Sequence, residues 1–473
     1  MKKIVGIVLS LVTAVSMCAC SKSGTANQFA DDKTSHVTSG KESQTGDDKG
    51  NGISDSDRVE RNSTDKGQPS DKDAEAVGGL KLLTDDTLPY ENSFATEEGY
   101  YYLSEDGFLK YIDYKTQREI YLCTDVSCRH NSEKCTARFT MDEFGTDSMI
   151  FVWKGYLYFL SRDYDNDGAS LSIGAGDMDL TEYRTAALYR MNLDGSGREK
   201  VYSFEDNQVV EKIVMADSDS LYFIVKFLKS EDGEGASYTS SSDKKLVQYD
   251  VKKHQISDKT ELDKDLYQVV GCSGSKLVFL KNEYPDGMSN EDIAKIDDSE
   301  FKNVAKNSTV RYISLDIHTG EKMDLAAFKN EGMRSTGFVS EGYLYYSDCF
   351  SGKIMKTKIE TGEEQTLCET DKNYIFWVTD DVLCCMGAGE DSDFLYYYID
   401  KQTGEIRQST LAIEKLGWSL ELRAANAENF LVVYKYDAKD LGDGSYDIQK
   451  KHFALISKKD MYESRANYRE IKQ

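Results

Sequence analysis

One short strand pattern recurs along most of the chain, and it limits the folds that the chain can adopt. Each copy has a turn, a strand rich in Tyr, Leu, Val and Phe, a polar turn or insertion, and a second strand that ends in Asp or at a Thr-Gly turn. The first strands of the copies are centred on Tyr101, Leu157, Tyr222, Val278, Leu344, Leu383 and Leu431. Such a recurring unit predicts a repeat architecture.

The composition and spacing of the copies predict an all-β fold. The chain has only three prolines, little helical periodicity, and many tyrosines and β-branched residues, which favour strands. The strand centres lie about 39 to about 66 residues apart, so the shortest steps match one four-stranded propeller blade and the longer ones include an insertion. A blade buries its apolar faces only against its neighbours, so we expect a closed ring, a β-propeller. We count about seven blades, with six or eight as alternatives, and the closing blade could combine both termini.

The fifth copy resembles a known propeller family. Its segment 344–348, Leu-Tyr-Tyr-Ser-Asp, is similar to the YWTD repeat of low-density-lipoprotein-receptor-type β-propellers, with Tyr346 in place of Trp and Ser347 in place of Thr. The turn 192–197, Asn-Leu-Asp-Gly-Ser-Gly, resembles the strand endings of TolB-like propellers. The resemblance implies a β-propeller with a role in extracellular interactions. It assigns no catalytic residue.

The first residues have the pattern of a bacterial lipoprotein signal peptide. Lys2 and Lys3 precede a short apolar run, and Ala19 lies directly before Cys20. The run is shorter than the roughly 20 residues that a membrane-spanning helix needs. The segment resembles a lipoprotein box, which implies cleavage after residue 19 and acylation of Cys20, with Cys18 as a weaker alternative. An ordinary secretory signal peptide is the other interpretation.

The residues between this cysteine and the first repeat are predicted to be a disordered tether. They are mainly Ser, Thr, Asp, Lys, Gly and Asn, and such a segment cannot bury enough apolar surface to offset its conformational entropy. A flexible chain of about 59 residues spans roughly 40 Å. We therefore expect a signal peptide at 1–19, an acylated tether at 20–79, and a propeller at 80–473. The propeller should face the extracytoplasmic side and be held at the cell membrane only by its lipid anchor.

The net charge of the chain is strongly negative, at −25. A negative surface repels phosphate backbones, so we expect no nucleic-acid partner. The acidic residues are spread along the sequence, as in many soluble extracellular proteins. We expect an extracellular protein, peptide or glycan as the partner.

Four candidate metal ligands lie close together after a predicted strand. Cys123, Cys128, His130 and Cys135 follow the spacing Cys-x4-Cys-x-His-x4-Cys. Three thiolates and one imidazole suit a tetrahedral zinc site. The single residue between Cys128 and His130 makes joint coordination by these two awkward. A disulfide, most easily between Cys128 and Cys135, is an alternative, and unpaired thiols are another. With a metal or a disulfide, the loop is a structural staple rather than an active site.

A second loop has partial features of a calcium site. Asp163, Asp165 and Asp167 alternate before Gly168, as at the start of a calcium-binding loop. The match then fails, because an EF-hand would have Glu at the position of Gly174. Alternating aspartates are also common in solvated turns.

Most other cysteines and the tyrosine runs are expected to be packed. Cys384 and Cys385 are adjacent in a predicted strand, so their side chains should point to opposite faces and pack as separate thiols. The tyrosine runs at 100–102 and 396–398 should alternate in the same way. Most of their rings would then fill the space between blades, and a few could stack against a ligand.

The sequence contains no recognisable catalytic motif. It has no Gly-x-Ser-x-Gly elbow, no His-Glu-x-x-His helix and no phosphate-binding glycine loop. A binding or scaffold module is therefore favoured over an enzyme. The alternative is a carbohydrate-active hydrolase or lyase with carboxylates at the propeller centre. Clustered acidic residues at the centre would favour the enzyme, and an aromatic or apolar patch on one face would favour binding.

Overall fold

The computed structural model describes most of the chain after residue 78. The described residues are 79–84, 92–104, 106–132, 134–139, 148–162, 185–230, 238–263, 266–288, 290–293, 296–329, 337–348, 352–370, 374–388, 394–413, 416, 418–441 and 446–473. Cys20, the predicted tether up to residue 78, and Asp163, Asp165 and Asp167 lie outside them. No helix in these described ranges is long and apolar enough to span a membrane.

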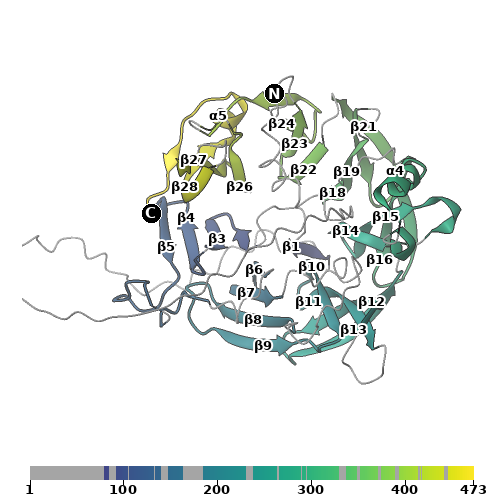
Figure 1. Ribbon diagram of the computed structural model, residues 1–473, viewed down its shortest axis with the longest axis horizontal. Helices are drawn as coiled ribbons and strands as arrows, with labels where there is room; N and C mark the ends of the chain where they lie inside the picture. The colour runs from purple at the N-terminus through teal and green to yellow at the C-terminus, as the bar shows by residue number, and fades with distance from the viewer. Residues whose placement is uncertain are drawn as a thin grey trace, which may run out of the picture. The chain divides into compact units, whose positions relative to one another are not determined.

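The recurring strand pattern forms an antiparallel hairpin in every repeat. In the fifth copy, Tyr343 pairs with Lys358 and Asp348 pairs with Lys353. One further strand pairs on each side of the hairpin. The described residues form seven antiparallel sheets in this way, arranged around a common centre (Figure 1). The chain is therefore a seven-bladed β-propeller, and the predicted all-β fold is confirmed.

The strands of each blade follow one another along the chain, from the innermost to the outermost. Blade 1 contains β2 (Ser93–Ala95), β3 (Gly99–Leu103), β4 (Leu109–Asp113) and β5 (Arg118–Tyr121). Blade 2 contains β6 (Met149–Trp153), β7 (Tyr156–Ser161), β8 (Ala187–Asn192) and β9 (Glu199–Ser203). Blade 3 contains β10 (Gln208–Ala216), β11 (Ser220–Ser230), β12 (Tyr238–Asp250) and β13 (Gln255–Leu262).

The remaining four blades repeat this order. Blade 4 contains β14 (Leu266–Ser273), β15 (Lys276–Glu283), β16 (Thr309–Asp316) and β17 (Lys322–Lys329). Blade 5 contains β18 (Gly337–Ser340), β19 (Tyr343–Asp348), β20 (Lys353–Lys358) and β21 (Glu364–Glu369). Blade 6 contains β22 (Tyr374–Val378), β23 (Val382–Ala388), β24 (Phe394–Asp400) and β25 (Ile406–Ser409). Blade 7 contains β26 (Glu421–Ala425), β27 (Asn429–Asp440), β28 (Tyr446–Ser457) and β29 (Arg469–Glu470).

Short helices occur where the strand pattern gave no sign of them. The insertion between β15 and β16 contains η3 (Pro285–Gly287), α3 (Asn290–Ile293) and α4 (Asp298–Lys306). α4 buries Val304 and Ala305, and such burial, rather than intrinsic propensity, stabilises a helix of this length. α5 (Lys458–Tyr462) follows β28.

The first described strand joins a blade that lies far along the chain. β1 (Lys81–Thr84) pairs antiparallel with β10, the innermost strand of blade 3, and so lies inside the ring of innermost strands. The backbone N–H of Leu80 donates to Gly274 O at 2.7 Å, in the turn between β14 and β15. The expectation that the closing blade could combine both termini is wrong, because β1 covers the free inner edge of β10 and blade 7 consists of C-terminal strands alone.

The ring closes between blade 7 and blade 1 through side-chain packing and through the last residues of the chain. Tyr100 of blade 1 and Leu431 of blade 7 belong to one buried apolar cluster. Beyond β29 the chain crosses to the outer edge of β5, next to the C-terminus in Figure 1. There Glu119 donates its N–H to Lys472 O at 2.8 Å, and Lys472 donates its N–H to Gln117 O at 2.9 Å.

Neighbouring side chains on the second strand of a blade serve two different interfaces. Tyr345 packs in a cluster shared by blades 5 and 6, whereas Tyr346 packs between blades 4 and 5. Cys384 and Cys385 are fully buried, the first between blades 6 and 7 and the second between blades 5 and 6. The predicted alternation of these side chains is confirmed.

The Asp at the end of the third strand caps the turn that follows. In blade 4, Asp316 Oδ1 accepts the backbone N–H of His318 at 2.8 Å and that of Thr319 at 3.0 Å, and Gly320, with a φ of 74°, completes the turn. Ser275 donates its hydroxyl to Asp316 Oδ2 at 2.5 Å. The Ser275 hydroxyl and the turn N–H groups outweigh desolvation and lower the pKa of Asp316 to about 2.

Substitution of this capping residue should make stability depend less on pH. Because the folded-state pKa of Asp316 is below the unfolded value near 3.9, its contribution is full above that value and is lost as the pH falls toward 2. We expect Asp316→Asn to lower the melting temperature by about 2 °C at pH 7 and by less at pH 3, as measured by calorimetry. Asp258→Asn, which removes an exposed ion pair with Lys245, is the control. An equal loss at both pH values would contradict the assignment.

Candidate metal centre

The loop that follows β5 folds back onto its own blade. The backbone N–H of Leu109 donates to Ala137 O at 2.8 Å, and the N–H of Phe139 donates to Gly107 O at 2.9 Å. Ala137 is fully buried. These contacts tie residues 122–139 to the outer part of blade 1 before the chain continues to blade 2.

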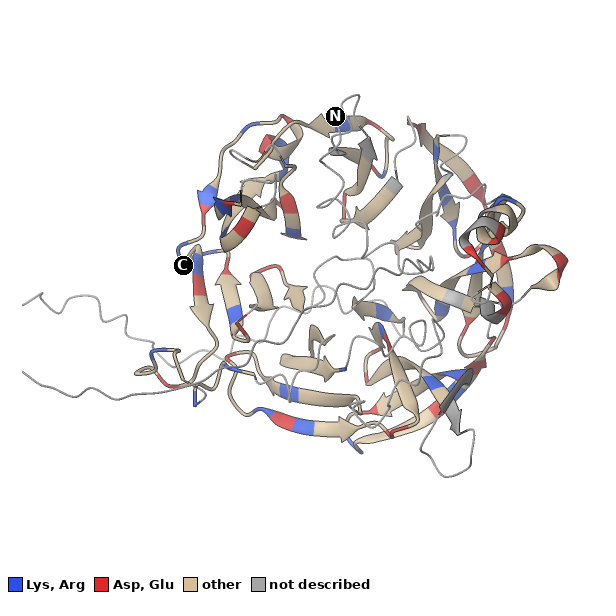
Figure 2. Cartoon of the chain, viewed as in Figure 1, with Lys and Arg blue, Asp and Glu red and all other residues tan. Residues whose placement is uncertain are grey.

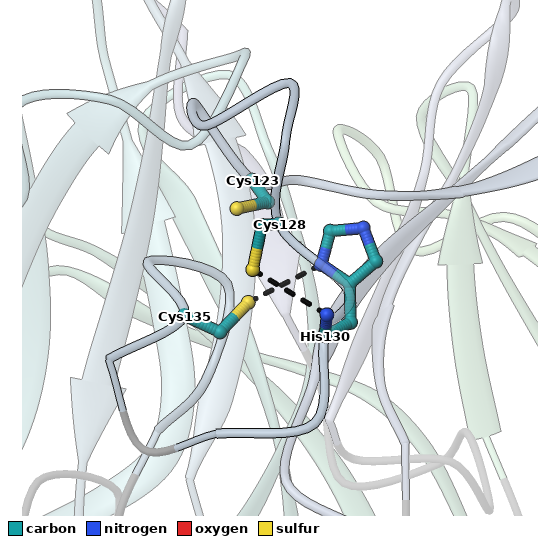
Figure 3. A group of neighbouring side chains, drawn as sticks. All are labelled: Cys123, Cys128, His130 and Cys135. Carbon is teal, nitrogen blue, oxygen red and sulfur yellow. Dashed lines mark hydrogen bonds between the residues drawn. The ribbon is translucent and has the colours of Figure 1, made fainter. Parts of the chain in front are cut away.

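This fold-back brings all four predicted ligands together. Cys123, Cys128, His130 and Cys135 each offer one donor atom, and all four atoms lie within 4.8 Å of one another (Figure 3). His130 Nδ1 lies 3.3 Å from Cys135 Sγ, and the backbone N–H of His130 donates to Cys128 Sγ at 3.4 Å. Within the described ranges, no other group of three or more His, Cys, Asp or Glu side chains is placed to hold a metal ion. We call these four residues the Cys/His centre.

The backbone accommodates the short spacing between Cys128 and His130. His130 has a φ of 53°, in the left-handed region that residues other than glycine seldom adopt. A tight turn precedes it, in which the N–H of Cys128 donates to Asp125 O at 3.1 Å. With this turn, the imidazole Nδ1 of His130 faces the thiol of Cys135 although one residue separates it from Cys128. The sequence does not reveal this conformation, so the spacing looked less favourable than it is.

Two neighbouring side chains support the centre from outside the ligand set. The ring of Tyr121, the last residue of β5, stacks on the imidazole of His130 with centroids 4.2 Å apart and planes 11° apart. The Thr136 hydroxyl donates to Cys123 Sγ at 3.4 Å. Sequence reasoning missed both residues, because neither belongs to a metal-binding pattern.

The local environment gives the thiols different proton affinities. Burial opposes ionisation of Cys123, but hydrogen bonds with Thr136 and other neighbours outweigh it and lower the pKa of Cys123 to about 7. Cys135 is only 4% exposed, and this burial raises its pKa to about 11. Cys123 is therefore partly ionised near neutral pH in the metal-free protein, and the thiolate is the form that binds metals.

The geometry of the centre fits a tetrahedral ion. The three cysteines are free thiols in the structure. Zinc lies about 2.3 Å from sulfur and about 2.0–2.1 Å from nitrogen, so its neighbouring ligand atoms are about 3.5–3.8 Å apart. Four donor atoms already within 4.8 Å need only a small contraction to reach that arrangement. One ion would use all four donors, whereas one disulfide would leave a third cysteine unpaired.

The cysteines outside this loop show no such grouping where the structure describes them. Cys272 donates its thiol to Leu80 O at 3.4 Å, and burial raises its pKa to about 12. Burial likewise raises the pKa of Cys368 to about 11. These thiols are packed and protonated. Because Cys20 and Asp163, Asp165 and Asp167 lie outside the described residues, acylation and calcium binding stay predictions.

A group of aromatic side chains lies on blade 7, where the strand pattern did not single it out. Trp418 precedes β26, and its ring centroid lies 6.1 Å from that of Tyr436 on β27 and 5.9 Å from that of Tyr446 on β28. All three residues are half-buried. We call them the aromatic cluster. The sequence does not indicate that these three residues lie together, because Trp418 is in a connection and the two tyrosines are on different strands.

The innermost strands carry few carboxylates, and these are paired with cations. Within the described innermost strands, Glu211 of β10 and Glu421 of β26 are the acidic residues. Glu211 lies 2.7 Å from Lys244 Nζ and 3.6 Å from Lys226 Nζ. Burial would raise the pKa of Glu211, but the two ammonium groups outweigh burial and lower it. Glu421 forms an ion pair with Arg423. Charged residues elsewhere are distributed around the ring (Figure 2).

Comparison with known proteins gives similarity of fold at low identity. No family model matches the sequence, and no curated protein matches it. TolB from Acinetobacter baumannii is 12% identical over 79% of this chain and 78% of its own, with a TM-score of 0.33. An oligogalacturonate lyase from Vibrio parahaemolyticus is 9% identical over 78% of this chain and 90% of its own, with a TM-score of 0.38. A puromycin hydrolase is 9% identical over 84% of this chain and 54% of its own, with a TM-score of 0.44. Similarities at this level carry no information about function.

The thiols of the metal-free centre should react at different rates. We expect iodoacetamide to modify Cys123 before Cys135, with a rate that rises through about pH 7, because only the thiolate reacts. Peptide mass spectrometry after timed alkylation measures both rates. Cys368, whose pKa is raised by burial, is the internal control and should react slowly below pH 9. Faster modification of Cys135 than of Cys123 would contradict the opposite pKa shifts of the two thiols.

Proposed function

We propose that the chain is a lipid-anchored, extracytoplasmic binding module that captures an extracellular protein, peptide or glycan. The aromatic cluster carries this proposal. Trp and Tyr rings present apolar faces and polar edges, which suit stacking against sugar rings or peptide side chains. Trp418, Tyr436 and Tyr446 are close together but only half-buried, so each residue keeps some surface exposed to solvent.

The position of the cluster in the topology supports this role. Connections between the second and third strands, and between successive blades, open on one face of the propeller because neighbouring strands are antiparallel. Trp418 lies in the connection between blades 6 and 7, and Tyr436 and Tyr446 flank the end of the β27–β28 hairpin. We call this face the loop face. The longest insertions of the sequence, such as residues 163–184, also fall in these connections.

The first described residues lie away from the loop face. The described chain begins at Gly79, beside the turn between β14 and β15, and turns between the first and second strands open away from the loop face. We propose that the lipid anchor is the membrane contact of the protein and that nucleic acid is not a partner.

The enzyme alternative is less well supported. A glycoside hydrolase needs one carboxyl held protonated as the general acid and a second carboxylate nearby. The lowered pKa of Glu211 keeps that group ionised, and Glu421 is engaged by Arg423. In the part of the chain that the structure describes, no pair of free carboxylates lies on the innermost strands.

Loss of the Trp ring should weaken ligand binding. The purified mature chain is first screened against arrays of extracellular glycans and peptides, and the best ligand is then titrated by calorimetry. We expect Trp418→Ala to reduce affinity at least about tenfold, as for a central aromatic contact.

Tyr156→Ala is the matched control for that titration. Tyr156 is an exposed aromatic residue of blade 2 at the opposite face, so its loss should leave the affinity unchanged. Equal affinity of Trp418→Ala and the unsubstituted chain would reject the aromatic cluster as the binding surface. Release of cleaved products from the ligand would favour the enzyme alternative.

We also infer that the Cys/His centre holds a zinc ion in a structural role. Zinc favours three thiolates and an imidazole in a tetrahedron, and the four donors already converge. Cys123, Cys128 and Cys135 would bind through Sγ, and His130 would bind through Nδ1, the nitrogen that faces Cys135 Sγ. Because all four positions of the tetrahedron are filled by protein, none is left for a substrate.

Zinc binding should be stoichiometric and should depend on each ligand. Protein purified under reducing conditions should contain one zinc per chain by elemental analysis. Cys128→Ser should weaken zinc binding in a chelator competition assay by at least about 100-fold, since it removes one thiolate ligand. Cys368→Ser, at a remote half-buried thiol, should leave binding unchanged. A disulfide found by mass spectrometry between two of the three cysteines in zinc-exposed protein would contradict the inference.

A further inference from the structure

The free edge of β5 is where the ring is completed by the last residues of the chain. Lys472 pairs with Gln117 and Glu119 through two backbone hydrogen bonds of 2.9 and 2.8 Å. Ile471 donates its N–H to Phe453 O at 2.9 Å on blade 7. The segment 471–473 is therefore shared by blade 7 and blade 1, and β5 is the strand that it holds.

A buried glutamate ties β5 to the rest of blade 1 and to the end of the chain. The Glu119 carboxylate, 7% exposed, accepts a hydrogen bond from Lys110 Nζ at 3.0 Å. It also accepts the Tyr102 hydroxyl at 2.7 Å and Gln473 Nε2 at 3.2 Å. Three strands of blade 1 and the C-terminal residue thus meet at one side chain.

The Cys/His centre contacts the same strand at its end. The imidazole of His130 lies flat on the ring of Tyr121, the last residue of β5. Lys110 Nζ lies 4.9 Å from the centroid of that ring, and this ammonium also binds Glu119. A continuous set of contacts therefore runs from His130 through Tyr121 and Lys110 to Glu119. It ends at residues 471–473 and their pairing with β5, which we call the C-terminal clasp.

The loop of the centre also reaches blade 2. Arg198 Nη1 donates to Arg138 O at 3.2 Å, and its guanidinium lies 4.2 Å from the ring centroid of Phe139. Arg138 in turn pairs with Phe108 of blade 1. The loop therefore lies between blade 1 and its successor, while β5 joins blade 1 to blade 7.

We propose that zinc at the Cys/His centre clamps β5 and thereby stabilises ring closure between blade 7 and blade 1. This inference rests on the zinc site proposed above. Zinc fixes His130, and the stacked imidazole holds Tyr121 and the end of β5 in place. The edge that receives Lys472 is then kept in register, so the clasp opens less often. A ligand that binds the closed form more tightly than the open one shifts the equilibrium toward closure.

Hydrogen exchange of the C-terminal peptide tests the clamp directly. The full mature chain is prepared with zinc and without it, and exchange of residues 464–473 is followed by mass spectrometry. We expect zinc to slow exchange of this peptide about tenfold, because the Lys472 amide is protected only while the clasp is closed. Peptides of β19 and β20 in blade 5 should show no change.

Substitution of Tyr121 separates zinc binding from its effect on the clasp. Tyr121→Leu removes the stacked ring but keeps all four ligands, so we expect one bound zinc and no slowing of C-terminal exchange. Tyr121→Phe retains the ring and should show the same slowing as the unsubstituted chain. This result would show that the missing effect in Tyr121→Leu comes from the lost ring and not from general unfolding. Tyr156→Leu, at an exposed tyrosine of blade 2, should behave like the unsubstituted chain.

The possible failures are distinguishable. If zinc binds with full stoichiometry and C-terminal exchange is unchanged, the clamp is rejected and the zinc site stands. The same holds if Tyr121→Leu keeps the full zinc effect. If no zinc binds, elemental analysis reports the failure of the zinc site itself, and the clamp is rejected with it.

Discussion

Packing of each blade against its two neighbours is the interaction on which the whole structure depends. A single four-stranded sheet has two apolar faces and cannot bury either one by itself. Successive side chains of the second strand point to opposite faces of the blade, so each face packs against one neighbouring blade. Tyr345 and Tyr346, for example, lie in different interfaces. The arrangement leaves blades 1 and 7 incomplete until they meet, so the ring needs a closing contact. Packing of Tyr100 against blade 7 and the pairing of Lys472 with β5 supply it.

The hairpins were predictable because their signal is local. An apolar strand, a turn and a strand that ends in a capping Asp lie within a short stretch, and period-two alternation specifies which face each residue uses. Pairing between distant segments leaves no such signal. The strand that begins at Lys81 looks like any short strand, and its partner near Ala216 is over 100 residues away. The pairing of Lys472 with β5 was unpredictable for the same reason, because the two segments are far apart in the sequence.

The Cys/His centre was predictable in composition but not in geometry. Residue types and approximate spacing identified the four candidate ligands, because soft donors in one short loop are uncommon. The feasibility of the set depended on the left-handed backbone of His130 and on the stacked ring of Tyr121. The aromatic cluster is the opposite case, since its members are 28 residues apart from Trp418 to Tyr446 and only the long hairpin of blade 7 brings them together. In the proposed function, the ring holds the aromatic cluster in place on the loop face.

Because Lys472 pairs with β5, the first blade to be synthesised is also the last to be finished. Until residues 471–473 are in place, the outer edge of β5 has no backbone partner. An unpaired strand edge is a template for pairing with other chains. A chain that stops before Ile471 would keep that edge open permanently. Loss of this segment would therefore leave an edge of blade 1 exposed even though all seven sheets could still form.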